Sequence, residues 1–384
     1  MRIAQVAPLW ESVPPKLYGG TERIVSYLTE ELVTRGHDVT LFASGDSETR
    51  ARLEGVCPQA LRMNTGIFNR DAPMTMLQER ALGAAGGFDI IHSHLDFLGF
   101  PLGRRNSVPV VTTLHGRLDL PELEPVFREY AEMPLVSISH AQRRPLSWAN
   151  WKATVHHGLP RNLYTFHPQA EGYLAFLGRI APEKRPDHAI AIAKRTGIPL
   201  RIAAKVDPAD QQYYRAEIEP LLDHPLIEFI GEISDAEKDE FVGNAMALVC
   251  PYDWPEPFGL VLIEALACGT PVLAYRRGSV PEVIDDGTTG FVCDDLSEMV
   301  DAVARIPFIE RHHCRTAFEA RFTADRMARD YVALYRRIVE ERAVRNTPNM
   351  HAIGSRVLNG DTFPPRRSEE ILVTRGGRHA RPFS

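Results

Sequence analysis

Short apolar segments alternate with helical segments along most of this chain of 384 residues, and this alternation limits the folds open to it. The segments are apolar almost throughout, which is typical of parallel strands buried on both faces. Strand, helix and strand in this order form right-handed βαβ units, so we expect an α/β fold with doubly wound parallel sheets. The strands are predicted at 2–7, 38–43, 89–92, 109–114, 134–138, 153–156, 173–178, 199–204, 227–231, 247–251, 271–275 and 291–293. Helices are predicted between them, for example at 21–35, 186–196, 209–222, 234–244 and 259–268.

The predicted strands divide into two series, separated by a polar stretch rich in Pro and Gly near 157–170. We therefore expect a Rossmann-like N-terminal domain at 1–157 and a second one at 158–323. In such sheets ligands bind at the carboxyl ends of the strands, so the two halves should face each other across a cleft.

The end of the chain divides into a helix and a tail. Large apolar residues at 327, 331, 334, 335, 338 and 339 recur at helical spacing and predict an amphipathic helix at about 324–345. Residues 346–384 are rich in Arg and contain few large apolar residues, which favours a flexible or surface-wrapping tail.

The segment EPFGLVLIE, from Glu256 to Glu264, carries the clearest chemical pattern. Glu256 falls in the loop before a predicted helix, and Glu264 lies on the helix face that also contains the helix start. The N–H groups at that start belong to Phe258, Gly259 and Leu260. Such N–H groups suit a phosphate, and carboxylates suit the hydroxyls of ribose or of a sugar. The pattern predicts a nucleotide-sugar site; the alternative is an amphipathic helix with two solvated glutamates.

Two further segments at strand ends carry groups that suit a diphosphate. Tyr18-Gly19-Gly20-Thr21-Glu22 follows the first strand, and its glycine pair lets the backbone approach a phosphate closely. GRIAPEK follows the first strand of the second half, and its Arg179 and Lys184 can clamp a diphosphate. Taken alone, the first segment can also be a plain glycine turn, and the second is better explained as a solvated cationic loop.

Two more strand ends complete the predicted site. His115 in TLHG ends a strand of the first half, and Gly231 in FIGEI ends a strand of the second half. By itself the histidine is more often structural, and the glycine is only a strand end.

Together these motifs resemble the retaining glycosyltransferases of sequence family 4, which have the GT-B fold. The two-glutamate segment with CGTPV behind it and the Arg/Lys segment carry the resemblance, which spans roughly residues 1–340. The opening loop LWESVPPKLYGGTE also resembles the avilamycin-type branch of the family. In this family the last helix crosses back onto the first domain.

The resemblance implies a role for each residue. It assigns Glu264 to the ribose hydroxyls, Glu256 to the sugar hydroxyls, Arg179 and Lys184 to the diphosphate, and His115 to the donor sugar. It places the Gly19-Gly20 loop against the diphosphate and the backbone after Gly231 against the nucleobase.

The chain departs from the family pattern at two places. Arg185 stands where relatives often have Gly, and His156-His157-Gly158-Leu159 stands where they often have Asn-Gly-Val-Asp. The second departure puts any hinge or base role of that stretch in doubt.

The implied activity is metal-independent, retaining transfer of a hexosyl group from a nucleoside diphosphate sugar, expected to be a UDP-sugar. The acceptor would be a sugar, a lipid-linked sugar or a small molecule, and no cofactor beyond the co-substrate is expected. A nucleotide-sugar 2-epimerase of the same fold is one alternative, although epimerases lack the two-glutamate segment with PFGL. A non-catalytic nucleotide-sugar-binding protein is another alternative. The presence of all four charged residues of the motifs argues against it; they are Arg179, Lys184, Glu256 and Glu264.

Composition excludes several other classes. The net charge of −6 gives no basic field for nucleic acid. The 5 scattered cysteines lack a C-x-x-C pair, and the acidic pairs Asp285-Asp286 and Asp294-Asp295 suit solvated turns better than a metal site. No signal peptide or membrane span is predicted, so we expect a cytoplasmic protein. Contact with a membrane surface through Arg104-Arg105 or Arg143-Arg144 is open but not indicated.

Overall fold

The computed structural model describes residues 1–16, 19–62, 64, 66–83 and 86–346. Tyr18 and the predicted tail from 347 to 384 lie outside the described residues. Residues Met1–Glu341 form one compact unit and Arg342–Ser384 a second one.

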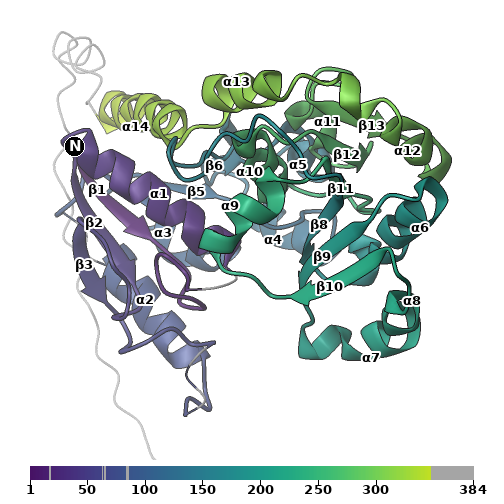
Figure 1. Ribbon diagram of the computed structural model, residues 1–384. Helices are drawn as coiled ribbons and strands as arrows, with labels where there is room; N and C mark the ends of the chain where they lie inside the picture. Colours follow the sequence, from purple (N-terminus) through teal and green to yellow (C-terminus); the bar gives the residue numbers. More distant parts are fainter. Residues whose placement is uncertain (17–18, 63, 65, 84–85, 347–384) are drawn as a thin grey trace, which may run out of the picture. The chain divides into compact units, whose positions relative to one another are not determined.

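Seven parallel strands form the first sheet in the order β3-β2-β1-β4-β5-β6-β7. Figure 1 labels β1, β2, β3, β5 and β6 of this sheet. The strands are β1 (Arg2–Val6), β2 (Asp38–Ala43), β3 (Arg52–Gly55), β4 (Ile90–Ser93), β5 (Val110–Thr113), β6 (Leu135–Ser137) and β7 (Trp151–Thr154). The helices between them are α1 (Gly20–Thr34), α2 (Asp71–Gly83), α3 (Phe100–Gly103), α4 (Leu123–Glu129) and α5 (His140–Arg143).

Six parallel strands form the second sheet in the order β10-β9-β8-β11-β12-β13. The strands are β8 (Leu174–Arg179), β9 (Leu200–Lys205), β10 (Ile227–Gly231), β11 (Ala247–Cys250), β12 (Val272–Tyr275) and β13 (Gly290–Cys293). The helices are α6 (Pro186–Thr196), α7 (Gln211–Tyr213), α8 (Glu219–Leu222), α9 (Asp235–Gly243), α10 (Leu260–Cys268), α11 (Val280–Val283), α12 (Leu296–Val303) and α13 (Arg311–Arg321). The α/β fold with two doubly wound parallel sheets is therefore confirmed.

The last helix, α14 (Ala324–Asn346), packs on the first sheet although it follows the second one in the chain. Its apolar face joins Ile3 of β1 and Ile24 and Leu28 of α1 in one buried cluster. The helix residues in this cluster are Met327, Ala328, Tyr331, Val332, Leu334, Tyr335 and Ile338. The predicted crossing helix is confirmed, and its buried face follows the spacing read from the sequence.

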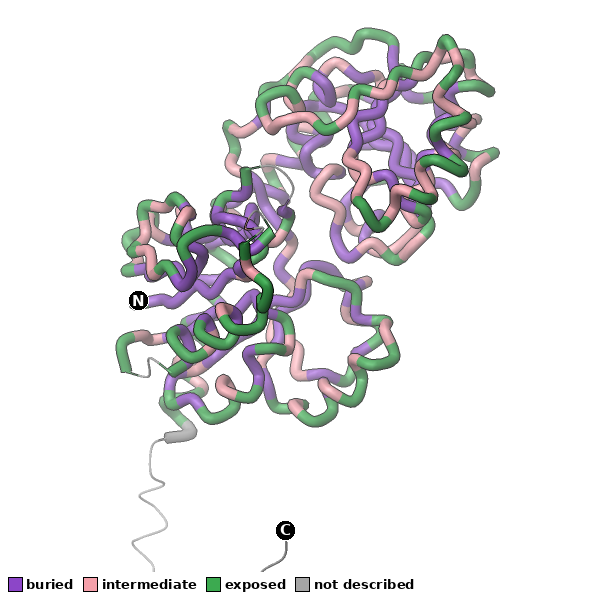
Figure 2. Tube along the Cα trace, turned by 90° about the horizontal axis from the view of Figure 1, so that it is seen from below, coloured by how far each residue is buried: buried purple, intermediate pink, exposed green. Residues whose placement is uncertain are grey.

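Burial follows the sheets: Figure 2 shows buried stretches inside both halves and exposed stretches outside them. The strands are buried along most of their length, as their continuous apolar sequences predict. All five cysteines are free and buried, in agreement with the absence of a disulfide pattern.

The predicted elements differ from the observed ones at a few places. Every predicted strand is present within two residues, but β3 was not predicted, because Arg52–Gly55 is a short edge strand with charged side chains. The helix predicted at 209–222 is interrupted by a π-helical stretch at Tyr214–Ile218 before α8. Pro220 in the first turn of α8 lacks the N–H that a continuous helix requires.

Each sheet has one point at which the strand order reverses, between β1 and β4 in the first sheet and between β8 and β11 in the second. Ligands of open α/β sheets bind outside the carboxyl ends of the strands at such points. The loops after these four strands, together with the helices that those loops lead into, contain most of the residues that the sequence assigned to the site.

Candidate functional site

Two adjoining cavities lie at the carboxyl ends of the two sheets. The larger has a volume of about 480 Å³ and the smaller about 140 Å³. Both are lined by residues of both halves, and five residues line both: Gly19, Gly20, Gly178, Leu260 and Val261. A single elongated ligand can therefore extend from one cavity into the other.

The larger cavity gathers most of the predicted site residues. Its lining includes Gly19, Gly20, His115, Arg179, Lys184, Glu256, Phe258, Gly259 and Leu260. Glu264 lines the smaller cavity. Gly231 lines neither cavity, but the residues that follow it, Glu232, Ile233 and Ser234, line the smaller one. The structure thus brings all of the predicted residues except Gly231 together in two adjoining cavities.

The smaller cavity holds a carboxylate with one unused oxygen. Glu264 is only 3% exposed, its Oε1 lies 3.6 Å from Lys238 Nζ, and its Oε2 has no hydrogen-bond partner. A buried acceptor without a partner is costly in a protein and is expected where a ligand completes it. The Oε2 atom can accept a hydrogen bond from a hydroxyl group in this cavity.

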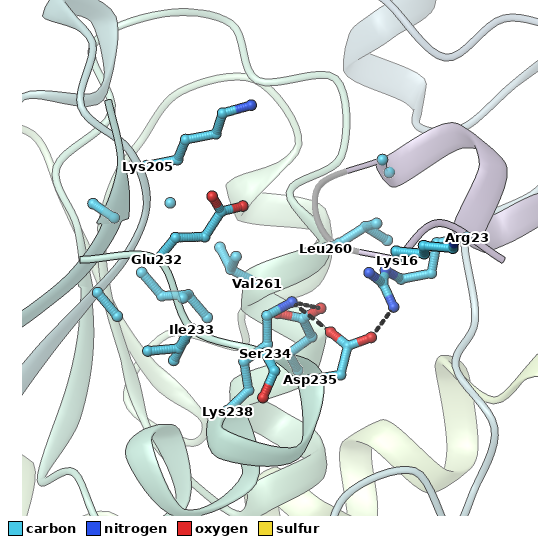
Figure 3. A pocket seen from close by; sticks show the side chains of 17 residues that line it. Lys16, Arg23, Lys205, Glu232, Ile233, Ser234, Asp235, Lys238, Leu260 and Val261 are labelled. Carbon is cyan, nitrogen blue, oxygen red and sulfur yellow. Dashed lines mark hydrogen bonds and ion pairs between the residues drawn. The ribbon is translucent and has the colours of Figure 1, made fainter. Parts of the chain in front are cut away.

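A group of charged side chains surrounds this carboxylate. Figure 3 shows Arg23 of α1 and Lys238 of α9 pointing toward Asp235. Burial alone would lower the pKa of Lys238, but Glu264 and Asp235 raise it above its ordinary value. Lys238 therefore stays charged beside the Glu264 carboxylate. The Arg23–Asp235 pair also joins the first half to the second at the cavity wall.

In the larger cavity, Lys184 and Glu256 form an ion pair. Lys184 Nζ lies 4.0 Å from the ring centroid of Tyr252 and 5.0 Å from that of Trp254, so both rings favour the cation. The Trp254 indole N–H donates to Glu256 Oε2 at 3.0 Å. Two aromatic residues of the loop after β11 therefore fix the positions of both charged groups.

The loop that contains Glu256 is held by the turn after β12. The N–H of Ser279 donates to the backbone oxygen of Glu256 at 3.0 Å, and its hydroxyl donates to the oxygen of Phe258 at 2.7 Å. Gly278 has a φ of 51°, and a Cβ at this position would lie 2.2 Å from the same Glu256 oxygen. Only glycine permits this close approach, so the turn fixes the Glu256 loop.

Arg179 contacts three carboxylates at the mouth of the larger cavity. Its guanidinium donates to Glu183 at 2.6 Å and lies 3.2 Å from Asp210 and 3.7 Å from Asp207. These carboxylates hold the guanidinium in place and offset its positive charge. An entering diphosphate would compete with them for the same N–H groups.

Arg185, the departure from the family pattern, lies outside both linings. It precedes α6 with a φ of 50° and donates to Asp187 Oδ2 at 2.7 Å. The hydrogen bond to Asp187 raises the pKa of the Arg185 guanidinium, although burial acts in the opposite direction. Arg185 therefore holds the first turn of α6 through Asp187 and does not line the site.

Two helices begin in the shared part of the cavities. Gly19 and Gly20 begin α1, and Gly259 precedes α10 with a φ of 79°, a conformation that favours glycine. A Cβ on Gly20 would lie 3.5 Å from Leu260 Cδ1, so the two helix starts are neighbours. The first N–H groups of a helix lack intrahelical acceptors and suit a phosphate.

His115 lies at the inner wall of the larger cavity. Its ring stacks on that of His157, with centroids 5.3 Å apart, and His157 packs edge-on against Phe258 at 4.9 Å. Burial lowers the pKa of His115 to about 3, so the imidazole is neutral at physiological pH. A neutral imidazole can position a sugar hydroxyl but does not neutralise a diphosphate.

The sequence analysis assigned no role to several residues that line the first half's side of the larger cavity. They are Trp10, Glu22, Arg62, His94, Asp96 and His157. Burial raises the pKa of Glu22 to about 6. Asp96 is exposed at the cavity, and its backbone φ is 49°. The protein atoms around its carboxyl displace water from it, and this desolvation raises the pKa of the carboxyl to about 6. Two histidines at a strand end, His92 and His94, were the signal in the sequence that could have indicated His94.

The acidic pairs considered for metal binding serve the fold. Asp285 pairs with Arg321 at 2.9 Å, Asp294 pairs with Arg276 at 2.9 Å, and Asp295 caps α12. Within the described part of the chain, no three His, Cys, Asp or Glu side chains are arranged to hold a metal ion. None of the helices in that part is long and apolar enough to cross a bilayer.

Two family models match nearly adjoining parts of the chain. The model "Glycosyltransferase Family 4" matches residues 18–161, and the model "Glycosyl transferases group 1" matches residues 165–312. The D-inositol 3-phosphate glycosyltransferase of Mycolicibacterium smegmatis is 26% identical over 355 residues, which cover 75% of this chain and 78% of that protein.

Solved structures share the fold. AviGT4, a glycosyltransferase involved in avilamycin A biosynthesis, has a TM-score of 0.64 and 22% identity, covering 88% of this chain and 98% of that one. HepE of Anabaena, solved with UDP and glucose, has a TM-score of 0.67 and 16% identity, covering 87% and 98%. From the two family models, the related enzyme and the shared fold, the chain belongs to the family 4 glycosyltransferases with the GT-B fold.

Proposed function

We propose that this glycosyltransferase moves a hexosyl group from a nucleoside diphosphate sugar to an acceptor hydroxyl, with retention of configuration and without a metal ion. One observation carries the proposal. The unpartnered oxygen of Glu264 and the cations Arg179 and Lys184 lie in two adjoining cavities. The ribose of a nucleoside diphosphate needs a hydrogen-bond acceptor, and the diphosphate attached to it needs cations, so the two cavities match the two parts of this ligand.

The nucleoside fits the smaller cavity. Glu264 would accept from a ribose hydroxyl, and the backbone after Gly231 would face the base. A uridine nucleotide is the donor we propose, supported by the UDP in the HepE structure of the same fold. The diphosphate would lie where the cavities join, against the N-termini of α1 and α10.

Cationic side chains would stabilise the leaving diphosphate. Negative charge grows on its oxygens as the glycosidic bond breaks, and Lys184 and Arg179 lie in the same cavity. Preorganised cations and helix N-termini that face a developing charge lower the activation barrier. We propose that these groups take the place of a metal ion.

Asp96 offers a test of the proposed stereochemistry. In a front-face reaction the departing phosphate takes the proton of the acceptor, and no protein base is needed. In an inverting reaction a carboxylate would take that proton, and Asp96 in the same cavity is the obvious base. We therefore expect Asp96→Asn to lower kcat by less than about tenfold, whereas loss of a general base typically costs about 10²–10⁴-fold. The anomeric configuration of the product, measured by NMR, would give an independent answer; an inverted product would refute retention.

The acceptor side favours an uncharged sugar or polyol. Glu22 and Asp96 line this side, and Arg62 pairs with Glu11 at 2.9 Å. Trp10 is 38% exposed and lines the same wall, where an indole can cover the face of a sugar ring. An acceptor phosphate, such as the D-inositol 3-phosphate in the relative's name, would meet carboxylates here. We expect uncharged acceptors to outcompete phosphorylated ones by kcat/KM; a reversed order would refute this assignment.

The activity itself is tested by incubating the protein with a set of UDP- and GDP-sugars, with and without a mixture of sugar acceptors. Acceptor-dependent release of the nucleoside diphosphate would support the proposal. An epimerised sugar nucleotide without acceptor would identify an epimerase, and binding without turnover would identify a non-catalytic protein. The matched control is Lys184→Met, which should remove turnover and leave the nucleoside cavity intact.

A further inference from the structure

Six hydrogen bonds connect His115 to the crossing helix α14. The bonds run from His115 Nε2 to His94 Nδ1 (2.9 Å), His94 Nε2 to Gln5 Oε1 (2.9 Å), Gln5 Nε2 to the Tyr335 hydroxyl (3.2 Å), that hydroxyl to His92 Nδ1 (2.6 Å), His92 Nε2 to the Thr113 hydroxyl (2.7 Å) and Thr113 to the Tyr331 hydroxyl (2.9 Å). We call this set the buried relay. It joins β1, β4, β5 and α14 to the wall of the larger cavity.

The relay is shielded from water. Gln5, His92, Thr113 and Tyr335 are fully buried, and Tyr331 and His94 are 1% and 2% exposed. Burial lowers the pKa of both His92 and His94 well below its ordinary value. Each imidazole is therefore neutral, with one ring nitrogen that donates and one that accepts.

The amide of Gln5 sets the direction of the relay near the cavity. Its oxygen can only accept and faces His94, and its nitrogen can only donate and faces Tyr335. His94 must therefore carry its proton on Nε2, which leaves Nδ1 to accept from His115. His115 in turn must carry its proton on Nε2.

The remaining ring atom of His115 is then an acceptor. Nδ1 has no proton in this tautomer, and Nε2 is occupied by His94. Because His115 lines the larger cavity, Nδ1 is the atom left for a ligand. A hydroxyl can donate to it, whereas the lone pairs of a carboxylate would repel it.

We propose that His94 is a positioning residue, which together with Gln5 and Tyr335 holds His115 in the Nε2-protonated tautomer, so that Nδ1 accepts a hydrogen bond from a hydroxyl of the donor sugar. This inference rests on the proposed function for the identity of the ligand. The crossing helix acquires a second role in this view, since Tyr335 orients the amide that sets the tautomer.

The tautomer can be measured without any substrate. Imidazole ¹⁵N NMR at neutral pH distinguishes the protonated nitrogen from the other one, and comparison with His115→Gln assigns the signals. We expect Nε2 of His115 to be protonated. Protonation on Nδ1 would mean that every bond of the relay is reversed, and it would overturn the inference.

Substitutions of His94 test the effect on the reaction. In His94→Asn the amide oxygen can take the place of Nδ1 and accept from His115, whereas His94→Leu offers no acceptor. We expect His94→Leu to lower kcat/KM by about three- to tenfold, the effect of one neutral hydrogen bond, and His94→Asn to restore most of it. Equal losses in both variants would reduce His94 to a packing residue and overturn the proposal.

Two controls separate this inference from the proposed function. UDP affinity should be the same in both His94 variants, because Glu264 and Lys238 lie in the other cavity. Absence of turnover with every nucleotide sugar would refute the proposed function, yet it would leave the NMR result standing. Normal turnover with Nδ1 protonated would refute the relay assignment and leave the proposed function standing.

Discussion

Removal of the Glu264 carboxylate should weaken nucleotide binding and leave the fold intact. The Oε2 atom has no partner in the protein, and Lys238 keeps its pairing with Asp235 at 3.0 Å when Glu264 is truncated. We therefore expect Glu264→Ala to change the melting temperature little. The exposed Glu240 on the neighbouring α9 provides a matched control as Glu240→Ala.

The magnitude follows from the two oxygens of Glu264. Oε1 already faces Lys238 at 3.6 Å, so only Oε2 gains a new partner when a ribose hydroxyl arrives. A hydrogen bond to a charged group contributes about 1.5–3 kcal/mol. This corresponds to a roughly ten- to hundredfold weaker Kd for UDP. The contact exists in the ground state and in the transition state, so KM should rise more than kcat falls.

Calorimetric titration with two nucleotides makes the assay specific for ribose. The wild-type protein should bind UDP about ten- to a hundredfold more tightly than 2′,3′-dideoxy-UDP, because only UDP supplies the hydroxyl donor. Glu264→Ala should bind the two nucleotides alike. If the variant loses the same affinity for both nucleotides, Glu264 acts on the cavity as a whole and the ribose assignment is wrong.

Three further predictions concern charge. Lys184→Met and Arg179→Met should each lower kcat by about a hundredfold or more at saturating donor, since each removes a cation facing the leaving group; near-normal turnover would place the clamp elsewhere. Activity should survive excess EDTA, and a loss that Mg²⁺ or Mn²⁺ restores would refute the metal-free proposal. The pKa of His92 and of His94 is lower in the folded state than in the unfolded state. The folded protein is therefore at its full stability above about pH 6.5, and each histidine lowers the free energy of unfolding by up to about 1.4 kcal/mol for each pH unit below that value. Urea unfolding of His94→Asn should therefore depend less steeply on pH than that of the wild type, and an unchanged slope would contradict the burial argument.

The sequence predicted the fold because each level of the argument pointed the same way. Continuous apolar strands identify parallel sheets, and the order of strands and helices identifies the doubly wound topology. The spacing of Tyr331, Leu334, Tyr335 and Ile338 identifies the buried face of α14. β3 was missed because a short, charged edge strand lacks the apolar pattern on which the prediction depends.

The candidate site was predictable where a motif stands at a strand end. Arg179 ends β8, Lys184 follows it, and Glu256 and Glu264 follow β11. The reversal of strand order brings those two strands together. No motif gave Trp10 or the other acceptor-side residues a role in the site. Their common wall depends on how the loops after β1, β3 and β4 fold, which the sequence pattern does not determine.

The buried relay shows most clearly why part of a site escapes sequence reasoning. Gln5, His92 and Tyr335 appear in the sequence as a polar residue in an apolar strand, a strand-end histidine and a core tyrosine. Each reads as an ordinary structural residue, and Tyr335 lies 243 positions from the His92 ring to which it bonds. Only the return of α14 onto the first sheet brings them together, and a buried polar group in this position must find a partner. The same helix that closes the core of the first half therefore also satisfies the polar groups behind His115, so the tautomer at the cavity depends on correct docking of α14.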